Sequence, residues 1–184
     1  VRPSAMSLPS PASAQPKVAP GVGSANAFYA MMDSYLGRPD AMGATVVVTV
    51  LNEDNAKKVA AGINESGAKA FAYKLDGTSS DACQALALTF ASEHGSIDVL
   101  VNNAGIIIRE PLDSPKVASN LQRTLDVNVM GTFLPTQAWL GALRETKGVI
   151  INVGSIASTT GIPNVVGYSP SKGAVKMLSQ ALAL

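Results

Sequence analysis

The chain has 184 residues, a formal net charge of +1, 47% hydrophobic residues and 15% charged residues. The near-neutral charge gives no basis for binding nucleic acid or an anionic membrane, and no apolar run approaches the roughly 20 residues of a transmembrane helix. The length fits one domain, and the apolar fraction fits a parallel sheet covered by helices on both faces. Because Cys83 is the only cysteine, no internal disulfide can form, and a reducing, cytoplasmic location is expected.

The first part of the chain, residues 1–40, differs in composition from the rest. It holds six of the eleven prolines within a background rich in Ser and Ala. This composition predicts an irregular or linker segment, followed by a globular domain over residues 41–184. The start of the chain contains little acid and some Ser, which leaves organellar targeting open as an alternative location.

From residue 43 onward, predicted strands and helices alternate. An apolar strand over 44–50 is followed by a helix that opens at Asn52 and ends near Gly67. The apolar residues of this helix, at the spacing i, i+3, i+4 and i+7, are Ala56, Val59, Ala60 and Ile63. The next strand covers 70–75 and closes at a turn.

A capping box formed by Asp81 and Gln84 predicts the start of the second helix, which ends near Gly95. Its apolar face consists of Cys83, Leu86, Ala87 and Phe90. A strand over 97–101, a long helix over 117–143 and an apolar strand over 148–153 follow. This alternation predicts an α/β fold, a doubly wound parallel sheet of the Rossmann type.

Small and polar residues follow the apolar strands, where the carboxyl ends of parallel strands form ligand sites. Asn102-Asn103-Ala104-Gly105 makes a tight, amide-rich turn after one strand, and Ser155 follows the last strand. Between them, Asn128 lies inside a helical pattern, where its amide competes for backbone hydrogen bonds. An Asn at such a position either faces solvent or has a specific task.

Tyr168 and Lys172 are four residues apart, which places both side chains on one face of a helix. A free phenol titrates at about pH 10 and exchanges protons poorly at neutral pH. A neighbouring ammonium favours the phenolate and makes the phenol a usable general acid/base. Pro170 removes one helical donor, so this helix must begin shortly before Tyr168.

Together, these segments resemble the short-chain dehydrogenase/reductase family over residues 42–184. The turn at 102–105, the isolated Asn, the Ser, and the Tyr–Lys pair stand in the order and spacing of that family. The stretch 165–184 is most similar to β-ketoacyl-acyl-carrier-protein reductases and to related polyol or steroid reductases. The resemblance implies NAD(P)-dependent interconversion of a small-molecule alcohol and a ketone by hydride transfer.

The resemblance also implies a role for each of the four catalytic positions. Tyr168 would exchange a proton with the substrate oxygen, which Ser155 would bind and orient. Lys172 would hold the nicotinamide ribose and favour the phenolate of Tyr168. Asn128 would anchor a water molecule that relays protons to solvent.

The dinucleotide site implied by the resemblance includes Asp76, Gly77, Asn103, Ala104, Gly105, Tyr168 and Lys172. The Asp76 carboxylate would accept an adenine amino hydrogen, but an ordinary turn Asp explains this position equally well. Asn103 would support the cofactor, and Asn102 would brace neighbouring strands. The strand over 44–50 ends in Val50-Leu51, which can bind neither a ribose nor a 2′-phosphate, so the preference between NAD and NADP stays open.

The sequence departs from the family at its Gly-rich turn, which lets backbone N–H groups approach the pyrophosphate. Within residues 1–40, only Gly21-Val22-Gly23 resembles that turn. No apolar strand is predicted before it, and a linker is expected there. The family's next strand and substrate loop are absent from this sequence, which stops at Leu184, so the Rossmann-like domain is predicted to be incomplete at both ends and to bind coenzyme weakly.

Two functions are consistent with the sequence. The first is an NAD(P)-dependent oxidoreductase, and the alternative is a non-catalytic or truncated relative that acts through association. His94, the only histidine, lies at a helix C-terminus, where a cation is favourable, and it lacks partners for a metal site. A homo-oligomer, a dimer or tetramer, is predicted because two helices carry more apolar residues than a monomer core requires. These residues are Phe133, Leu134, Trp139, Leu140 and Leu143 on one helix, and Val175, Met177, Leu178, Leu182 and Leu184 on the other.

Overall fold

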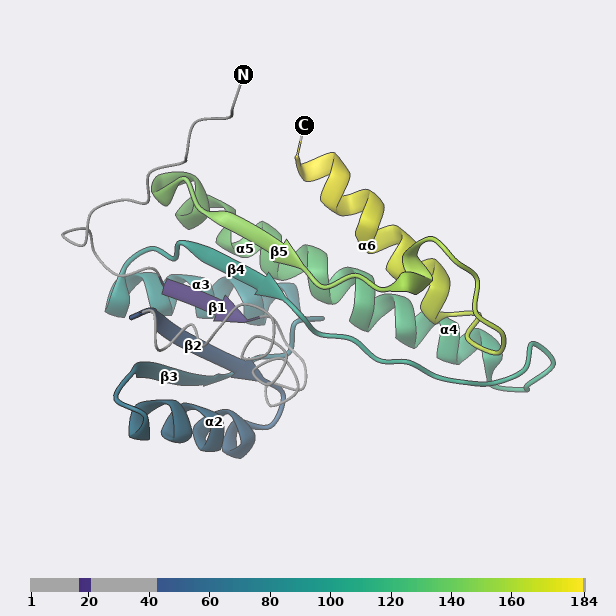
Figure 1. Cartoon of the computed structure of the whole chain (residues 1–184), viewed down its shortest axis with the longest axis horizontal. Coiled ribbons are helices and arrows are strands. Elements are labelled where there is room, and N and C mark those ends of the chain that lie inside the picture. Colours follow the sequence, from purple (N-terminus) through teal and green to yellow (C-terminus); the bar gives the residue numbers. More distant parts are fainter. Residues whose placement is uncertain (1–16, 21–42, 184) are drawn as a thin grey trace, which may run out of the picture.

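The computed structural model describes residues 17–20 and 43–183 (Figure 1). These residues form one parallel sheet with the strand order β3-β2-β1-β4-β5. The strands are, in chain order, β1 (Lys17–Pro20), β2 (Thr45–Val50), β3 (Lys69–Lys74), β4 (Val99–Asn102) and β5 (Val149–Asn152). The strand order reverses its direction between β1 and β4, and ligands of doubly wound sheets bind beyond the carboxyl ends of the strands at such a point. The predicted doubly wound sheet is confirmed.

Strand β1 corrects one of our expectations, because it lies inside the segment 1–40 for which we predicted no strand. Its backbone pairs in parallel with both neighbours, for example Val18 with Val46 of β2 and with Val99 of β4. The sequence pattern misses this strand because it has four residues and ends in a proline, which normally argues against a central strand. The candidate turn Gly21-Val22-Gly23 lies outside the described residues.

Helices cover both faces of the sheet, as predicted. On one face, Val46, Val48 and Val50 of β2 pack against α2 (Glu53–Glu65). On the other face, Val47 packs in a core that includes residues of α3 (Ser80–His94) and α5 (Gly131–Thr146). Because successive side chains of a strand alternate between the two faces, a strand of consecutive valines is buried on both.

Helices α2 and α3 begin at polar caps, one of which was predicted. The side chain of Asn52 accepts a hydrogen bond from the Asn55 backbone N–H at 3.0 Å and opens α2. Helix α3 is capped by Ser79, whose hydroxyl accepts from the Ala82 N–H at 3.2 Å. The prediction of a cap at Asp81 is therefore wrong by two residues, whereas the predicted apolar face of α3 is buried.

The long helix predicted over 117–143 is continuous in the chain but changes its winding. Helix α4 (Val117–Leu125) runs into one π-helical turn, η1 (Asp126–Met130), and α5 continues from there to Thr146. A π turn is rare and is frequently found at functional sites. Asn128 lies at its centre and is fully buried, which excludes the solvent-facing interpretation of this residue.

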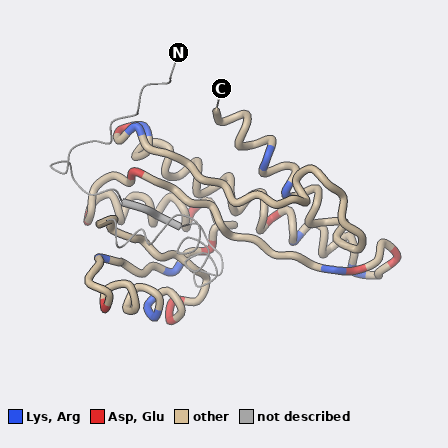
Figure 2. Tube along the Cα trace, viewed as in Figure 1, with Lys and Arg blue, Asp and Glu red and all other residues tan. Residues whose placement is uncertain are grey.

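Helix α6 (Tyr168–Leu182) lies beside β5 and packs at its N-terminal end against α4, η1 and a short 3₁₀ helix, η2 (Ile156–Ser158). The loop after β4 extends past this helix to the start of α4 (Figure 1). A parallel bridge between Glu110 and Val165 ties the loop to the segment before α6. Charges of both signs are mixed along α2 and on this loop (Figure 2). Within the described ranges, no helix is long and apolar enough to cross a membrane.

Candidate active site

Three of the predicted site residues meet beyond the carboxyl ends of β4 and β5. Gly105 follows β4, Asn128 comes from η1, and Lys172 comes from α6. A Cβ atom added to Gly105 would lie 3.4 Å from Asn128 Oδ1 and 3.6 Å from Lys172 Nζ. A side chain larger than hydrogen at position 105 would therefore occupy the space in front of both polar groups.

The side chain of Asn128 is held by three hydrogen bonds within the protein. Its Oδ1 accepts from the Ile106 N–H at 2.7 Å, and its Nδ2 donates to the Ile106 carbonyl at 3.0 Å. The same Nδ2 donates to the Ser171 hydroxyl at 2.8 Å. Both amide protons are therefore used internally, so only an oxygen lone pair or the backbone of Asn128 is available to bind a water molecule.

Lys172 is a buried cation, with 5% of its surface exposed. Its Nζ donates to the Val153 carbonyl at 2.7 Å, directly beyond the end of β5. Burial lowers the pKa of Lys172 below its usual value, because the charged form loses hydration. Among the described residues, no carboxylate forms an ion pair with it. An ammonium has three donors, so Lys172 can donate to a bound molecule while it keeps its bond to Val153.

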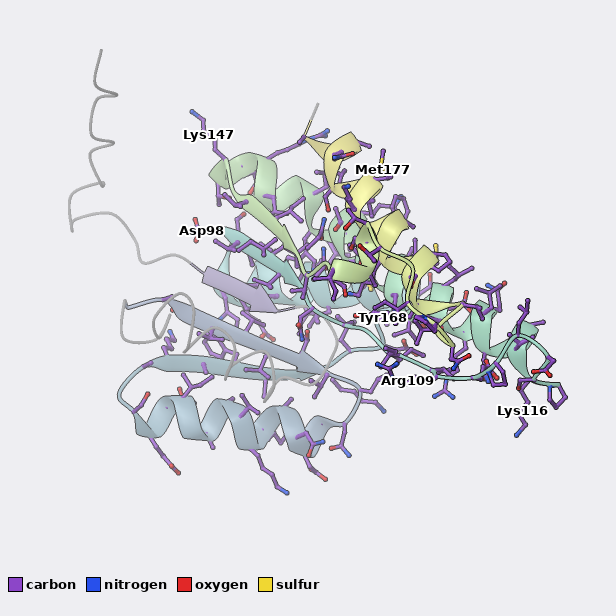
Figure 3. All side chains as sticks on the ribbon, turned by 45° about the vertical axis from the view of Figure 1, so that its right-hand side comes forward. Asp98, Arg109, Lys116, Lys147, Tyr168 and Met177 are labelled. Atoms are coloured by element: carbon purple, nitrogen blue, oxygen red, sulfur yellow. The ribbon has the colours of Figure 1, made fainter. Side chains whose placement is uncertain are left out.

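Tyr168 is the first residue of α6, and Lys172 lies one turn later on the same face, as predicted. The Nζ atom of Lys172 is 6.0 Å from the centroid of the Tyr168 ring. Pro170 falls in the first turn of the helix, where the missing N–H has no helical acceptor to lose. Gly167 lets this helix start close to α4, since an added Cβ would lie 3.3 Å from Thr124 Oγ1. Figure 3 shows Tyr168 near Arg109, where the loop after β4 passes the start of α6.

Ser155 caps the short helix η2. Its hydroxyl accepts from the Ala157 N–H at 3.1 Å, and the Ser158 hydroxyl accepts from the Ser155 N–H at 3.1 Å. This reciprocal cap fixes the position of the Ser155 side chain. The cap uses the oxygen of Ser155 as an acceptor, so its O–H remains able to donate to a substrate oxygen. Because η2 packs against α6, Ser155 lies on the element that adjoins the Tyr–Lys helix.

The other predicted cofactor residues have separate environments. Asp76 is exposed, and its Oδ1 accepts from the Thr78 N–H at 2.9 Å and from the Thr78 hydroxyl at 2.7 Å, as a turn Asp would. Gly77 is buried, and its carbonyl accepts a hydrogen bond from the Cys83 thiol at 3.7 Å. Both follow β3, which β2 and β1 separate from β4. At about 4.8 Å per strand, roughly 14 Å lies between the two parts of the predicted site.

The Asn-Asn-Ala-Gly turn divides into bracing and ligand-facing residues. Asn102 is 2% exposed, and its Nδ2 donates to Asn152 of β5 at 2.9 Å and to Thr136 of α5 at 2.8 Å. The prediction that Asn102 braces neighbouring strands is therefore confirmed. The side chain of Ala104 lies in the hydrophobic core, which leaves only its backbone to contact a ligand. Asn103 is half-buried beside Gly105.

His94 lies away from the site, in an aromatic cluster rather than on an open surface. Its ring stacks on Phe71 with centroids 3.9 Å apart, and its Nε2 is 3.0 Å from the Tyr73 hydroxyl. Burial and a hydrogen bond to Glu93 raise the pKa of Tyr73 to about 12. No group of three or more metal-ligating side chains occurs in the part of the chain that the structure describes.

The sequence interpretation missed one polar residue of the site. Ser171 is fully buried, and its hydroxyl contacts both Asn128 and the Tyr168 carbonyl. A signal for it was present, because residue 171 lies one turn after Tyr168 on a helix and faces the same side. A serine there has a functional explanation only once Asn128 is known to lie opposite.

The chain is similar to proteins of one family over most of its length. Residues 37–184 match the family model described as short chain dehydrogenase. The chain is 35% identical to cyclopentanol dehydrogenase of Comamonas sp. over 143 residues, 77% of this chain and 57% of that protein. It is 36% identical to glucose 1-dehydrogenase 2 of Bacillus subtilis over 124 residues, 66% of this chain and 48% of that protein.

A solved structure shares the fold and is partly similar in sequence. A gluconate 5-dehydrogenase from Burkholderia cenocepacia, in complex with NADP and tartrate, matches with a TM-score of 0.80 and 27% identity, covering 91% of this chain and 64% of that one. The chain spans about half the length of the curated relatives that it matches. Sequence and fold agree over the matched region, and the chain belongs to the short-chain dehydrogenase family.

Proposed function

We propose that this chain carries the proton-transfer and nicotinamide-binding residues of an NAD(P)-dependent oxidoreductase that interconverts an alcohol and a ketone. The observation that carries the proposal is the buried Lys172 ammonium, which lies near the Tyr168 ring and in front of Gly105. Burying a cation with no carboxylate partner costs free energy. Such a cost is typical of functional sites, where perturbed titratable groups gather.

The residues present fit a nicotinamide dinucleotide. The free donors of Lys172 suit ribose hydroxyls, and the absence of a side chain at Gly105 leaves room beside them. Asp76 and Gly77 lie about 14 Å away along the same edge of the sheet, a separation that an extended dinucleotide would bridge. When bound, the nicotinamide would supply or accept the hydride. Neither the exposed Leu51 after β2 nor its neighbours distinguish NAD from NADP.

The residues of the protein would transfer the proton that accompanies the hydride. In the direction of reduction, the substrate oxygen gains a proton, and Tyr168 is the group proposed to donate it. The neighbouring Lys172 cation stabilises the phenolate that remains. The hydroxyl oxygen of Ser155 is held in place by its cap, and its O–H would donate to the same substrate oxygen and orient it. Asn128, both of whose amide protons are engaged within the protein, would act chiefly by holding the π turn against the loop after β4.

Hydride transfer tests this proposal directly. The chain is incubated with NADH or NADPH and a panel of cyclic ketones, sugar lactones and ketosteroids, and loss of reduced nicotinamide absorbance is followed. Consumption of coenzyme that requires the ketone supports the oxidoreductase. A folded chain that consumes none with either coenzyme would favour the alternative, a non-catalytic relative that acts through association.

We also infer that copies of the chain associate. Phe133 of α5 is 39% exposed, and Met177 and Leu182 of α6 are 60% and 45% exposed; Met177 projects away from the sheet (Figure 3). The apolar surface is smaller than predicted, because Trp139, Leu143 and Val175 are buried in the chain's own core. Light scattering at tens of micromolar should show species larger than a monomer, and a compact monomer would contradict the inference.

A further inference from the structure

The hydroxyl of Ser171 connects two parts of the proposed site. It accepts a hydrogen bond from Asn128 Nδ2 at 2.8 Å and donates one to the Tyr168 carbonyl at 2.7 Å. A hydroxyl has a single donor, so these two contacts fix the orientation of its O–H. Ser171 is 0% exposed, and water therefore does not replace either contact.

A chain of hydrogen bonds runs through this hydroxyl. The loop after β4 binds the Asn128 amide through both backbone groups of Ile106. The amide binds Ser171, and Ser171 binds the first turn of α6, which carries Tyr168. A single hydroxyl thus joins the π turn to the helix that presents the proposed proton donor and the buried cation.

We propose that Ser171 is a positioning residue, which holds the Asn128 amide in one orientation and fixes the start of α6 against it. Its effect on catalysis rests on the proposed function, because it acts through Tyr168 and Lys172. Its effect on Asn128 does not depend on that function. Without the hydroxyl, one Asn128 amide proton is buried without an acceptor, and only the two bonds to Ile106 hold the amide.

The same helix provides a matched control. Ser179 accepts from Asn152 Nδ2 at 2.9 Å and donates to the Val175 carbonyl at 2.8 Å. Ser179 and Ser171 have the same bonding pattern. In each case an asparagine amide donates to the serine hydroxyl, and the hydroxyl donates to a backbone carbonyl of the preceding turn. Ser179 contacts β5 rather than Asn128. A general loss of stability in α6 would follow from either Ser→Ala change, but a loss at Asn128 would follow only from Ser171→Ala.

The first measurement is side-chain amide exchange in the ¹⁵N-labelled full chain. Both Asn128 side-chain protons should exchange slowly, and Ser171→Ala should speed their exchange about tenfold, as expected for loss of one internal hydrogen bond. Ser171→Thr keeps a hydroxyl that can bind the carbonyl of the preceding turn, and it should restore slow exchange. Ser179→Ala should leave Asn128 unchanged and affect Asn152 instead.

The second measurement is steady-state kinetics of the same variants. Ser171→Ala should lower kcat about tenfold while KM stays within about threefold, because displaced reacting groups impair chemistry more than binding. Ser171→Thr should recover most of kcat, and Ser179→Ala should retain it. If the wild-type chain transfers no hydride, the proposed function fails, and amide exchange alone decides the role of Ser171. Unchanged exchange at Asn128 in Ser171→Ala, or an equal change in Ser179→Ala, would overturn the proposal.

Discussion

Replacing Asn128 with Ala should lower the free energy of unfolding by about 3–5 kcal/mol, a large effect for one small side chain. The amide makes three hydrogen bonds, to the N–H and carbonyl of Ile106 and to the Ser171 hydroxyl. Asn128 is 0% exposed, and its removal takes a partner from the N–H and the carbonyl of the half-buried Ile106 and from the Ser171 hydroxyl, which keeps its bond to the Tyr168 carbonyl. Each group that loses its partner costs about 1–3 kcal/mol. Water that enters the new cavity replaces some of these bonds and keeps the total cost near the lower limit of the sum.

The single tryptophan provides the signal for this measurement. Trp139 is 2% exposed, and its ring lies 5.5 Å from the Phe90 ring, centroid to centroid, in the core. Its fluorescence should follow urea unfolding, and the midpoint and slope of the transition give the free energy. The matched control is Asn120→Ala, which removes one partly buried bond to Glu110 and should cost about 1 kcal/mol or less. Equal losses in the two variants would refute the conclusion that Asn128 anchors the π turn.

Three further predictions concern charge and ligand binding. Lys172→Met should stabilise the chain at neutral pH, because burial lowers the pKa of Lys172 below 10.5 in the folded state. Above the folded pKa the unfolded state holds more protons than the folded state, so the wild-type chain gains stability as the pH rises towards 10.5 and the advantage of the variant should shrink. Denaturant titrations at several pH values measure this difference, and a constant difference would contradict the prediction. The pKa of Tyr73 is raised from 10.0 to about 12 in the folded state. The stability that the neutral phenol contributes should therefore be fully present below pH 10 and be lost between pH 10 and about 12. An equal loss of stability over this pH range in Tyr73→Phe, which has no phenol, would contradict the prediction. Calorimetry should give a coenzyme dissociation constant above about 10 μM, corresponding to about −7 kcal/mol or weaker, and tighter binding would reveal a phosphate-binding turn that the sequence pattern does not indicate.

The sequence predicts the elements whose residues carry a periodic pattern. The apolar face of α3 was predicted from its helical spacing and the strand β2 from its run of apolar residues, and the predicted apolar residues of α3 and the valines of β2 are buried. The separation of Tyr168 from Lys172 predicts their shared helix face, and Pro170 correctly predicts where α6 begins. These features are local, because they depend on residues within one or two turns of each other.

Features that depend on distant partners could not be predicted in this way. Strand β1 is too short for a periodic pattern and is held by the backbones of β2 and β4. The π turn of η1 has no sequence period of its own, and the burial of Asn128 depends on Ile106 and on α6. The observed cap of α3, Ser79, differs from the predicted cap, Asp81, because both residue types are acceptable caps and tertiary packing selects between them.

Turnover by Tyr168→Phe tests the central claim most directly, that Tyr168 is the proton donor of an alcohol/ketone oxidoreductase. The substitution removes only the phenolic hydroxyl of a half-buried side chain, so the unfolding transition should stay close to that of the wild-type chain. General acid/base catalysis is typically worth about 10²–10⁴-fold, and kcat should fall by about that factor. Retention of wild-type kcat within about threefold would contradict the assignment of Tyr168.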